Sequence, residues 1–208
     1  MSKYTWQERA KELDSGDSLA AFRRRFYESD EKVIYLDGNS LGRLPVSVED
    51  SLRDHLLDKW GGRLIRSWNE DWLEMRRRTA AKLASLLGCE EDEIFVGDST
   101  SVNLYKLAYG ALKYKKSRTS IVTDSLNFPT DLYILQGLIK EQFCNHTLTV
   151  IQSDDDMMMS EDKIFDELHG GTALLTLSHV TYKSAFLYDM EGITRVAHDR
   201  GALVLWDL

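Results

Sequence analysis

Several short polar stretches of the sequence carry residues that could bind a small molecule. The first is FVGDSTSVNLYKL, residues 95–107, where an apolar run is followed by a small polar loop and a helical pattern. This loop would place backbone N–H groups and the hydroxyls of Thr100 and Ser101 at the N-terminus of a helix. Because free amides and the helix dipole favour an anion there, the stretch predicts a phosphate site. The alternative, that Ser99 to Ser101 only cap the helix, stays open, since the loop has neither a Walker A nor a GxGxxG pattern.

Three further stretches offer an aromatic ring, a hydroxyl-rich loop and a carboxylate. In TDSLNFPTDLYI, Phe128 could stack on a flat ring, or simply pack against its neighbours. In LSHVTYKSAF, Ser178, His179 and Tyr182 crowd one loop, and the histidine could act as an acid or a base, although a lone loop histidine usually does not. Asp207 follows the apolar run of GALVLWDL, where a carboxylate either caps a helix or pairs with a cation.

The elements that must position these residues alternate regularly along the second part of the chain. Short apolar runs and helical patterns predict strands at 94–96, 120–123, 147–152, 172–177 and 202–206, with helices at 102–112, 131–141, 161–168 and 193–200. This alternation predicts an α/β fold with a mostly parallel sheet and helices on both faces. Before it, the spacing predicts helices at 46–58 and 71–87 and a third one capped by Ser18. We therefore expect a helical segment, 1–90, that includes the loop LDGNSLG, followed by an α/β domain, 91–208.

The carboxyl ends of parallel strands share one edge of a sheet, so the four polar stretches should meet there. Together they provide a phosphate cradle, an aromatic ring, a hydroxyl-rich loop and a carboxylate. Pyridoxal phosphate needs such a set, because its ring takes a stacking partner and its pyridinium nitrogen takes an acidic partner. The sequence therefore predicts a pyridoxal phosphate site.

Composition excludes several other classes of function. The 208 residues carry a formal net charge of −8, which argues against nucleic acid or an anionic membrane as a partner. Two arginine triplets, 23–25 and 76–78, lie in helical patterns and are interpreted as solvated helix faces. No apolar run is long enough to cross a bilayer, and the polar start lacks the features of a signal peptide. The two cysteines have no CxxC spacing, so we expect no metal site and a cytoplasmic location.

The order of motifs in the chain resembles kynureninase, a family of pyridoxal phosphate enzymes of fold type I. The resemblance runs from about residue 30 to residue 208. The motifs that carry it are LDGNSLG, KWGGRLIRSW, TSVNLYKL, NFPTD and HVTYKSAFLYDMEGITRVAHDRGALVLWDL. Their combination favours kynureninase over the related cysteine desulfurases and aminotransferases.

This resemblance implies a role for eleven residues. The residues that contact the cofactor would be Thr100 and Ser101 at its phosphate, Phe128 on its ring, Pro129, Thr130 and Asp131 in the same turn, Ser178, and Asp207 at the pyridinium nitrogen. The residues near the substrate would be Asn39, Ser40 and Trp68, the last in its aromatic pocket. His179 is given no role beyond its proximity.

The family activity is the hydrolysis of L-kynurenine, or of 3-hydroxykynurenine, in tryptophan catabolism and NAD biosynthesis, by a homodimer. The Schiff-base lysine and the carboxy-terminal domain of the family are expected beyond Leu208, so this chain would hold the cofactor-binding half and be inactive alone. Two alternatives stay open. One is a non-enzymatic remnant that binds a partner chain, and the other is a different class-V pyridoxal phosphate enzyme.

Overall fold

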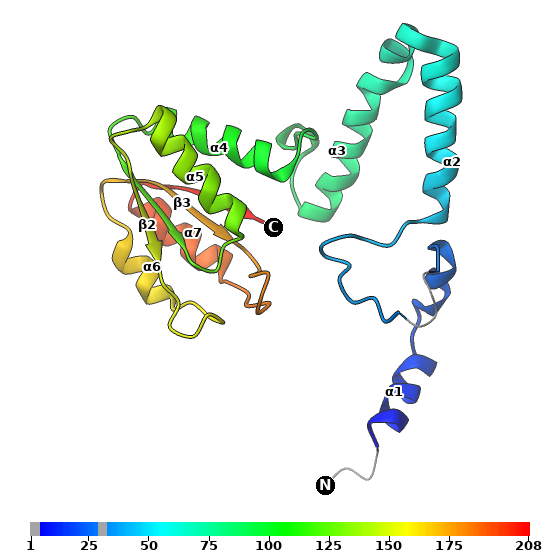
Figure 1. Cartoon of the computed structure of the whole chain (residues 1–208), viewed down its shortest axis with the longest axis horizontal. Coiled ribbons are helices and arrows are strands. Elements are labelled where there is room, and N and C mark those ends of the chain that lie inside the picture. The colour runs from blue at the N-terminus through cyan, green and yellow to red at the C-terminus, as the bar shows by residue number, and fades with distance from the viewer. Residues whose placement is uncertain (1–4, 29–32) are drawn as a thin grey trace. The chain divides into compact units, whose positions relative to one another are not determined.

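The computed structural model describes residues 5–28 and 33–208, and the chain divides into two compact units, Met1–Val96 and Gly97–Leu208. Figure 1 shows both, and each is described by itself here. The proposed domain boundary after residue 90 stays a prediction, and the start of the family resemblance near residue 30 lies outside the described residues. No helix among the described residues has both the length and the apolar character that crossing a membrane requires.

The first unit, called unit 1, is helical. Its elements are α1 (Trp6–Ser15), η1 (Ala20–Arg25), α2 (Val46–Asp54), η2 (His55–Arg63), η3 (Leu64–Arg66), η4 (Trp68–Trp72), α3 (Leu73–Leu87) and η5 (Glu91–Glu93). Helix α1 begins with a capping box, in which the Glu8 amide donates to Thr5 Oγ1 and the Thr5 amide donates to Glu8 Oε2. Helix α3 ends at Gly88, whose φ of 70° suits glycine at a helix C-terminus.

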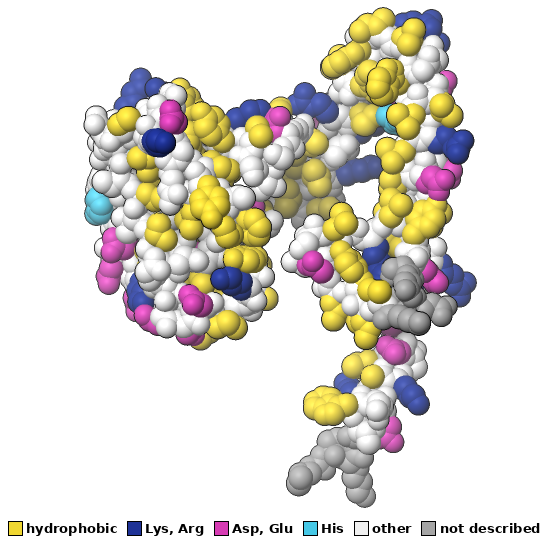
Figure 2. Space-filling model, viewed as in Figure 1, with side chains coloured by type: hydrophobic (Ala, Val, Ile, Leu, Met, Phe, Trp, Pro, Cys, Tyr) yellow, Lys and Arg dark blue, Asp and Glu magenta, His cyan; other side chains and the backbone are white. Residues whose placement is uncertain are grey.

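Two sequence predictions in unit 1 need correction. Ser18 does not cap a helix, because the 3-10 turn η1 follows Leu19, whose amide is bound instead by the carboxylate of Asp17 at 2.8 Å. The helix predicted for 46–58 is α-helical only to Asp54 and continues as the π-helix η2. Few side chains of unit 1 are buried, and many apolar ones are exposed, as Figure 2 shows for the hydrophobic side chains along its helices.

The second unit, called unit 2, is an α/β domain. Its elements are α4 (Thr100–Tyr114), β1 (Ser120–Asp124), α5 (Pro129–Gln142), β2 (Thr147–Ile151), α6 (Glu161–Glu167), β3 (Thr172–Ser178), α7 (Met190–Asp199) and β4 (Leu203–Asp207). The sheet has the order β2-β1-β3-β4, and all three strand pairs are parallel. In the last pair, Ser178 is in register with Asp207, so these two residues end neighbouring strands side by side.

Helices cover both faces of this sheet (Figure 1). On one face, Ile121 of β1 packs with Ala108 and Leu112 of α4 and with α5. On the other face, the next residue, Val122, packs in the cluster that holds Ile164 of α6 and buried residues of α7. The two sides alternate because neighbouring residues of a strand point to opposite faces. The predicted α/β class with a parallel sheet between helices is confirmed.

Four of the five predicted strands are present, and the first is not. Residues 94–96 are not a strand, although Ile94 has extended backbone angles. Phe95 is 65% exposed, and no described strand pairs with this segment. An apolar run becomes a strand only when a neighbour completes its backbone hydrogen bonds, so local pattern alone misassigned it.

Candidate functional site

The carboxyl edge of the unit 2 sheet gathers polar residues from three strands. Strands β1, β3 and β4 end at Asp124, Ser178 and Asp207. The chain leaves β1 for β2 on one side and then returns to β3 on the other side of β1, so the strand order switches direction between β1 and β3. Open α/β sheets bind ligands at the carboxyl ends of strands beside such a switch point.

A pocket of about 220 Å³ lies at this edge. It is formed by the first turns of α4 and α5 and by the end of β4. The residues that line it are Thr100, Asn103, Leu104, Leu107, Asp131, Leu205, Trp206 and Asp207. The pocket thus brings together three of the predicted cofactor residues, Thr100, Asp131 and Asp207, from three different elements.

The pocket disfavours the ionised forms of its two carboxyl groups, those of Asp131 and Asp207. Asp131 is buried, and its pKa rises to about 6 because of that burial and then because of the negative charge of Asp207; a hydrogen bond from Thr130 acts in the opposite direction. Burial also raises the pKa of Asp207. No lysine, arginine or histidine lines the pocket, and within the described part of the chain nothing hydrogen-bonds to the Asp207 carboxylate. The pair therefore suits a cationic group, such as a protonated ring nitrogen.

The first turn of α4 combines the cap with free groups for an anion. The Ser99 hydroxyl caps the helix by accepting from the Val102 amide at 3.4 Å, and the Asn103 side chain donates to the Gly97 carbonyl at 2.8 Å. The side chains of Thr100 and Ser101 have no hydrogen-bond partner among the described residues. The capping interpretation is therefore right for Ser99, and it leaves the amides and hydroxyls of Thr100 and Ser101 available at the helix N-terminus.

Phe128 stands at the junction between β1 and α5. It precedes Pro129, the first residue of α5, and its ring contacts that of Tyr182 edge to face, with 5.1 Å between the centroids. The Phe128 side chain is 46% exposed, so the core does not enclose its ring. Pro129 and Thr130 are exposed as well. This exposure leaves the ring accessible to a flat ligand.

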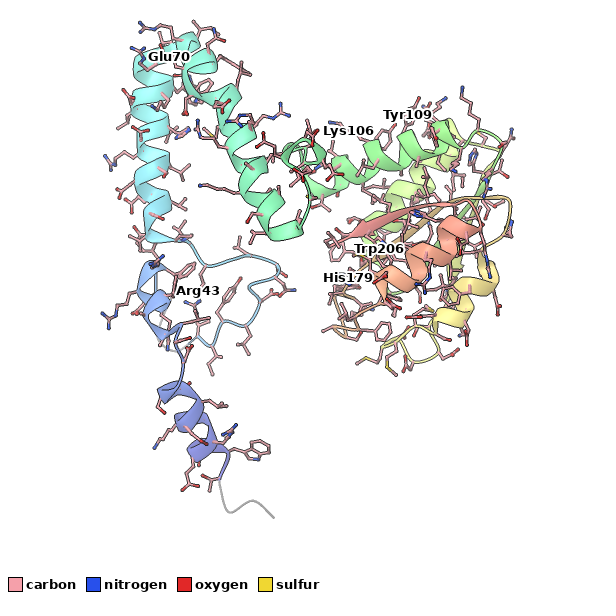
Figure 3. The ribbon with its side chains drawn as sticks, turned by 180° about the vertical axis from the view of Figure 1, so that it is seen from behind. Arg43, Glu70, Lys106, Tyr109, His179 and Trp206 are labelled. Atoms are coloured by element: carbon pink, nitrogen blue, oxygen red, sulfur yellow. The ribbon has the colours of Figure 1, made fainter. Side chains whose placement is uncertain are left out.

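The loop after β3 is tied to the end of β4. The His179 amide donates to the Asp207 carbonyl at 2.7 Å, and the His179 ring lies against Trp206 with 6.0 Å between the centroids (Figure 3). Trp206 is fixed in turn by a hydrogen bond from its Nε1 to Thr194 Oγ1 at 2.9 Å. Ser178 is buried beside these residues.

Sequence reasoning missed three buried residues of this edge as functional candidates, namely Asp124, Asn127 and Tyr188. The Tyr188 hydroxyl donates to Asp124 Oδ2 at 2.5 Å, and burial raises the pKa of both groups. Asp124 is the last residue of its strand, as Asp207 is, and that signal could have identified it. Asn127 lies in the NFPTD motif, but Tyr188 is found only once the fold brings its loop to β1.

The predicted substrate residues belong to unit 1. Asn39 and Ser40 lie in an exposed turn, and Trp68 is 49% exposed with its ring edge-on to Trp72 at 5.8 Å between centroids. Since the units are described separately, the role of these three residues at the substrate stays a prediction.

Comparison with protein families and with curated proteins gives concordant results. The profile of the aminotransferase class-V family matches residues 34–208. The chain is 40% identical over 201 residues to kynureninase of Pseudomonas fluorescens, a match that covers 94% of this chain and 46% of that protein. It is 39% identical over 207 residues to kynureninase of Burkholderia mallei, covering 97% of this chain and 48% of that protein. The chain thus spans about half the length of the curated relatives that it matches.

Solved structures share the fold at much lower identity. The cysteine desulfurase CsdA of Escherichia coli matches with a TM-score of 0.72 and 16% identity, over 91% of this chain and 48% of that one. A variant of C-DES with glycine covalently linked to its pyridoxal phosphate cofactor matches with a TM-score of 0.71 and 16% identity, over 86% of this chain and 47% of that one. At this level of identity the likeness establishes the fold.

Proposed function

The chain belongs to the aminotransferase class-V family, and from that membership and the geometry of the Asp207 pocket we propose that it is the pyridoxal phosphate-binding part of a kynureninase. The observation that supports this most is the pocket itself. It joins a carboxylate that has no partner in the described chain to a helix N-terminus with free hydroxyls. The identity of about 40% to curated kynureninases is the basis for the reaction that we propose.

The residues at the carboxyl edge of the unit 2 sheet, of which Thr100, Asp131 and Asp207 line the pocket, would fit each part of this cofactor. Thr100 and Ser101 would bind the phosphate with their hydroxyls and with the amides of the first turn of α4. Phe128 would stack on the ring, and Asp207 would hold a proton on the ring nitrogen through a charge-assisted hydrogen bond. Pro129, Thr130 and Asp131 would complete the turn around the cofactor, with Ser178 beside it. The raised pKa values of Asp131 and Asp207 fit a pocket whose negative charge a cation would compensate.

The proposed reaction is the hydrolysis of the Cβ–Cγ bond of L-kynurenine or its 3-hydroxy form. Water adds its oxygen to the γ-carbonyl carbon, which leaves as anthranilate, or 3-hydroxyanthranilate, and a proton is delivered to Cβ, which leaves as L-alanine. When bound, pyridoxal phosphate supplies the electron sink that takes up the electron pairs released at the amino-acid carbons. The chain's own contribution is to hold that sink, with Asp207 keeping the ring nitrogen protonated and Phe128 orienting the ring.

The part of the reaction that moves protons at the substrate is proposed to come from residues outside this sequence. No lysine lines the pocket, although a lysine is the usual group for covalent attachment and proton transfer in this chemistry. We therefore expect the 208-residue chain alone to bind the cofactor and to release no anthranilate. Asn39, Ser40 and Trp68 of unit 1 are proposed to contact the substrate.

A chimera tests the proposed reaction. The matched 46% of the Pseudomonas fluorescens kynureninase would be replaced by this chain, and the product would be assayed with kynurenine and with cysteine. We expect anthranilate from kynurenine and no sulfur release from cysteine. Sulfur release without anthranilate, or a folded chimera that holds pyridoxal phosphate but acts on neither substrate, would contradict the proposal.

The setting of the enzyme is proposed on separate grounds. The exposed apolar side chains of the unit 1 helices, such as Leu57 and Ile65, support a homodimer that covers them. The free cysteines, Cys89 and Cys144, support a reducing, cytoplasmic location, and the reaction supports a role in tryptophan catabolism and NAD biosynthesis. Sedimentation of the purified chain tests the first point, because a monomer at all concentrations would contradict it.

A further inference from the structure

Two loops at the switch point of the sheet carry the residues that would surround the cofactor ring. The loop after β1 carries Phe128, and the loop that follows Ser178, the last residue of β3, carries Tyr182. The Phe128 ring is 46% exposed and meets Tyr182 only at its edge. Packing in the core therefore does not hold this ring, and its orientation depends on the backbone of its own loop.

A single buried side chain joins the two loops. Asn127 is 3% exposed and stands immediately before Phe128. Its Oδ1 accepts from the Ser178 amide at 2.5 Å, and its Nδ2 donates to the Thr176 carbonyl at 3.1 Å and to Thr123 Oγ1 at 2.6 Å. One amide thus spans the gap between β1 and β3 with all three of these bonds, at the place where the strand order switches.

A second buried contact reinforces the first. Asp124 Oδ1 accepts from the amides of Leu126 and Asn127 at 2.8 and 2.9 Å, which fixes the turn that leads to Phe128. Its Oδ2 accepts from the hydroxyl of Tyr188, whose own amide donates to the His179 carbonyl at 3.1 Å. The loop after β1 and the loop after β3 are therefore connected twice, through side chains that do not line the pocket.

From this geometry we infer that Asn127 is a positioning residue for the cofactor, which sets the backbone of Phe128 and Ser178 on the two sides of the ring while Asp124 and Tyr188 brace the same loops. This inference rests on the proposed function. A purely stabilising role is the alternative, since a buried amide with satisfied hydrogen bonds also contributes to the stability of the fold. If Asn127 positions the cofactor, its removal should weaken cofactor binding more than an equal loss of stability elsewhere in the domain does. If it only stabilises the fold, the two losses should weaken binding equally.

The test compares Asn127→Ala with Ile164→Val, which removes one methyl group from the buried core at α6 and breaks none of the hydrogen bonds that join the two loops. Both variants should lower stability, by an amount measured in urea. We expect Asn127→Ala to weaken pyridoxal phosphate binding about tenfold, and Ile164→Val to leave it unchanged. Equal affinity of Asn127→Ala and the unchanged chain would overturn the inference. Failure of the unchanged chain to bind at all would instead refute the proposed function.

If the unchanged chain does not bind pyridoxal phosphate, amide hydrogen exchange of the chain without cofactor still tests whether Asn127 positions the two loops. In Asn127→Ala, exchange should accelerate at the amides of residues 126–128, 130–131 and 178–182 while the amides of β1 at 121–123 stay protected. Uniform acceleration over unit 2 would overturn the inference, because it would mean lost stability without local repositioning. If Asn127→Ala does not fold, Tyr188→Phe serves in its place, since it removes only the hydroxyl bound to Asp124 and keeps the ring that packs on Phe186. For Tyr188→Phe, faster exchange confined to the two loops would support the inference, and uniform acceleration over unit 2 would overturn it.

Discussion

Asp131 and Asp207 face one pocket without a basic residue among its lining, and the charge of Asp207 adds to burial in raising the pKa of Asp131 to about 6. Such a pair is unfavourable when both groups are ionised, and it becomes favourable when a cation enters between the two charges. The repulsion between the two ionised carboxylates is thus found where the protonated ring nitrogen is proposed to bind. This coincidence links the stability of the domain to the function of its pocket.

The first prediction concerns the pH dependence of stability. Because the folded pKa of Asp131, about 6, exceeds its ordinary value of 3.8, the unfolded chain binds fewer protons between these values, so stability falls as pH rises through this window. The dipole of α5 favours the ionised form, but by only about 0.3–1 kcal/mol, so burial and Asp207 prevail. Between about pH 4 and pH 7, the unchanged chain should lose roughly 2–3 kcal/mol relative to Asp131→Asn. Urea unfolding of both proteins measures this difference, and parallel curves would refute it.

The second prediction separates the cap of α4 from the anion site. Ser99→Ala removes the acceptor for the Val102 amide and should lower the free energy of unfolding by about 1 kcal/mol. Thr100→Ala removes no hydrogen bond in the described structure, so it should change stability little. It should, however, reduce the preference of the chain for pyridoxal phosphate over pyridoxal, which lacks the phosphate. An undiminished preference in Thr100→Ala would show that its hydroxyl does not bind the phosphate.

The third prediction concerns the ring of Phe128. Replacement by alanine should weaken pyridoxal phosphate binding about threefold to tenfold, because stacking on an aromatic face contributes about 0.5–1.5 kcal/mol. Tyr133→Ala is the matched control, since Tyr133 is another exposed aromatic residue of the same region and has no proposed contact with the cofactor. The two affinities are compared by equilibrium dialysis. Equal losses in both variants would mean that Phe128 acts without stacking.

Much of the fold was predictable from the periodicity of the sequence. Alternating apolar runs and helical patterns located four strands and the helices of unit 2, and parallel strands then implied a shared carboxyl edge. The prediction was wrong at 94–96, because a strand depends on a partner that local pattern does not reveal. Unit 1 was harder, since its π-helical turns leave the α-helical spacing on which the prediction relied.

The site residues that could be predicted from the sequence are those whose role follows from their position at the start of a helix or the end of a strand. Asp207 ends an apolar run, and Thr100 starts a helix, so both were visible in the sequence. The frame of Asp124, Asn127 and Tyr188 was not, because its hydrogen bonds join residues up to 64 positions apart. The effect of the Asp207 charge on Asp131 was equally hidden, since it depends on the fold bringing the start of α5 and the end of β4 to one pocket.

The most direct test of the proposed site is a titration of the chain with pyridoxal phosphate, with Asp207→Asn as the variant and Asp199→Asn as the control. Asp199 is an exposed carboxylate at the end of α7 and does not line the Asp207 pocket, so its loss changes net charge alone. We predict saturable binding to the unchanged chain and to Asp199→Asn, and binding about 10–100-fold weaker to Asp207→Asn, because a charge-assisted hydrogen bond is lost. Equal affinity of all three proteins, or no saturable binding to the folded chain, would contradict the assignment of this pocket to the cofactor.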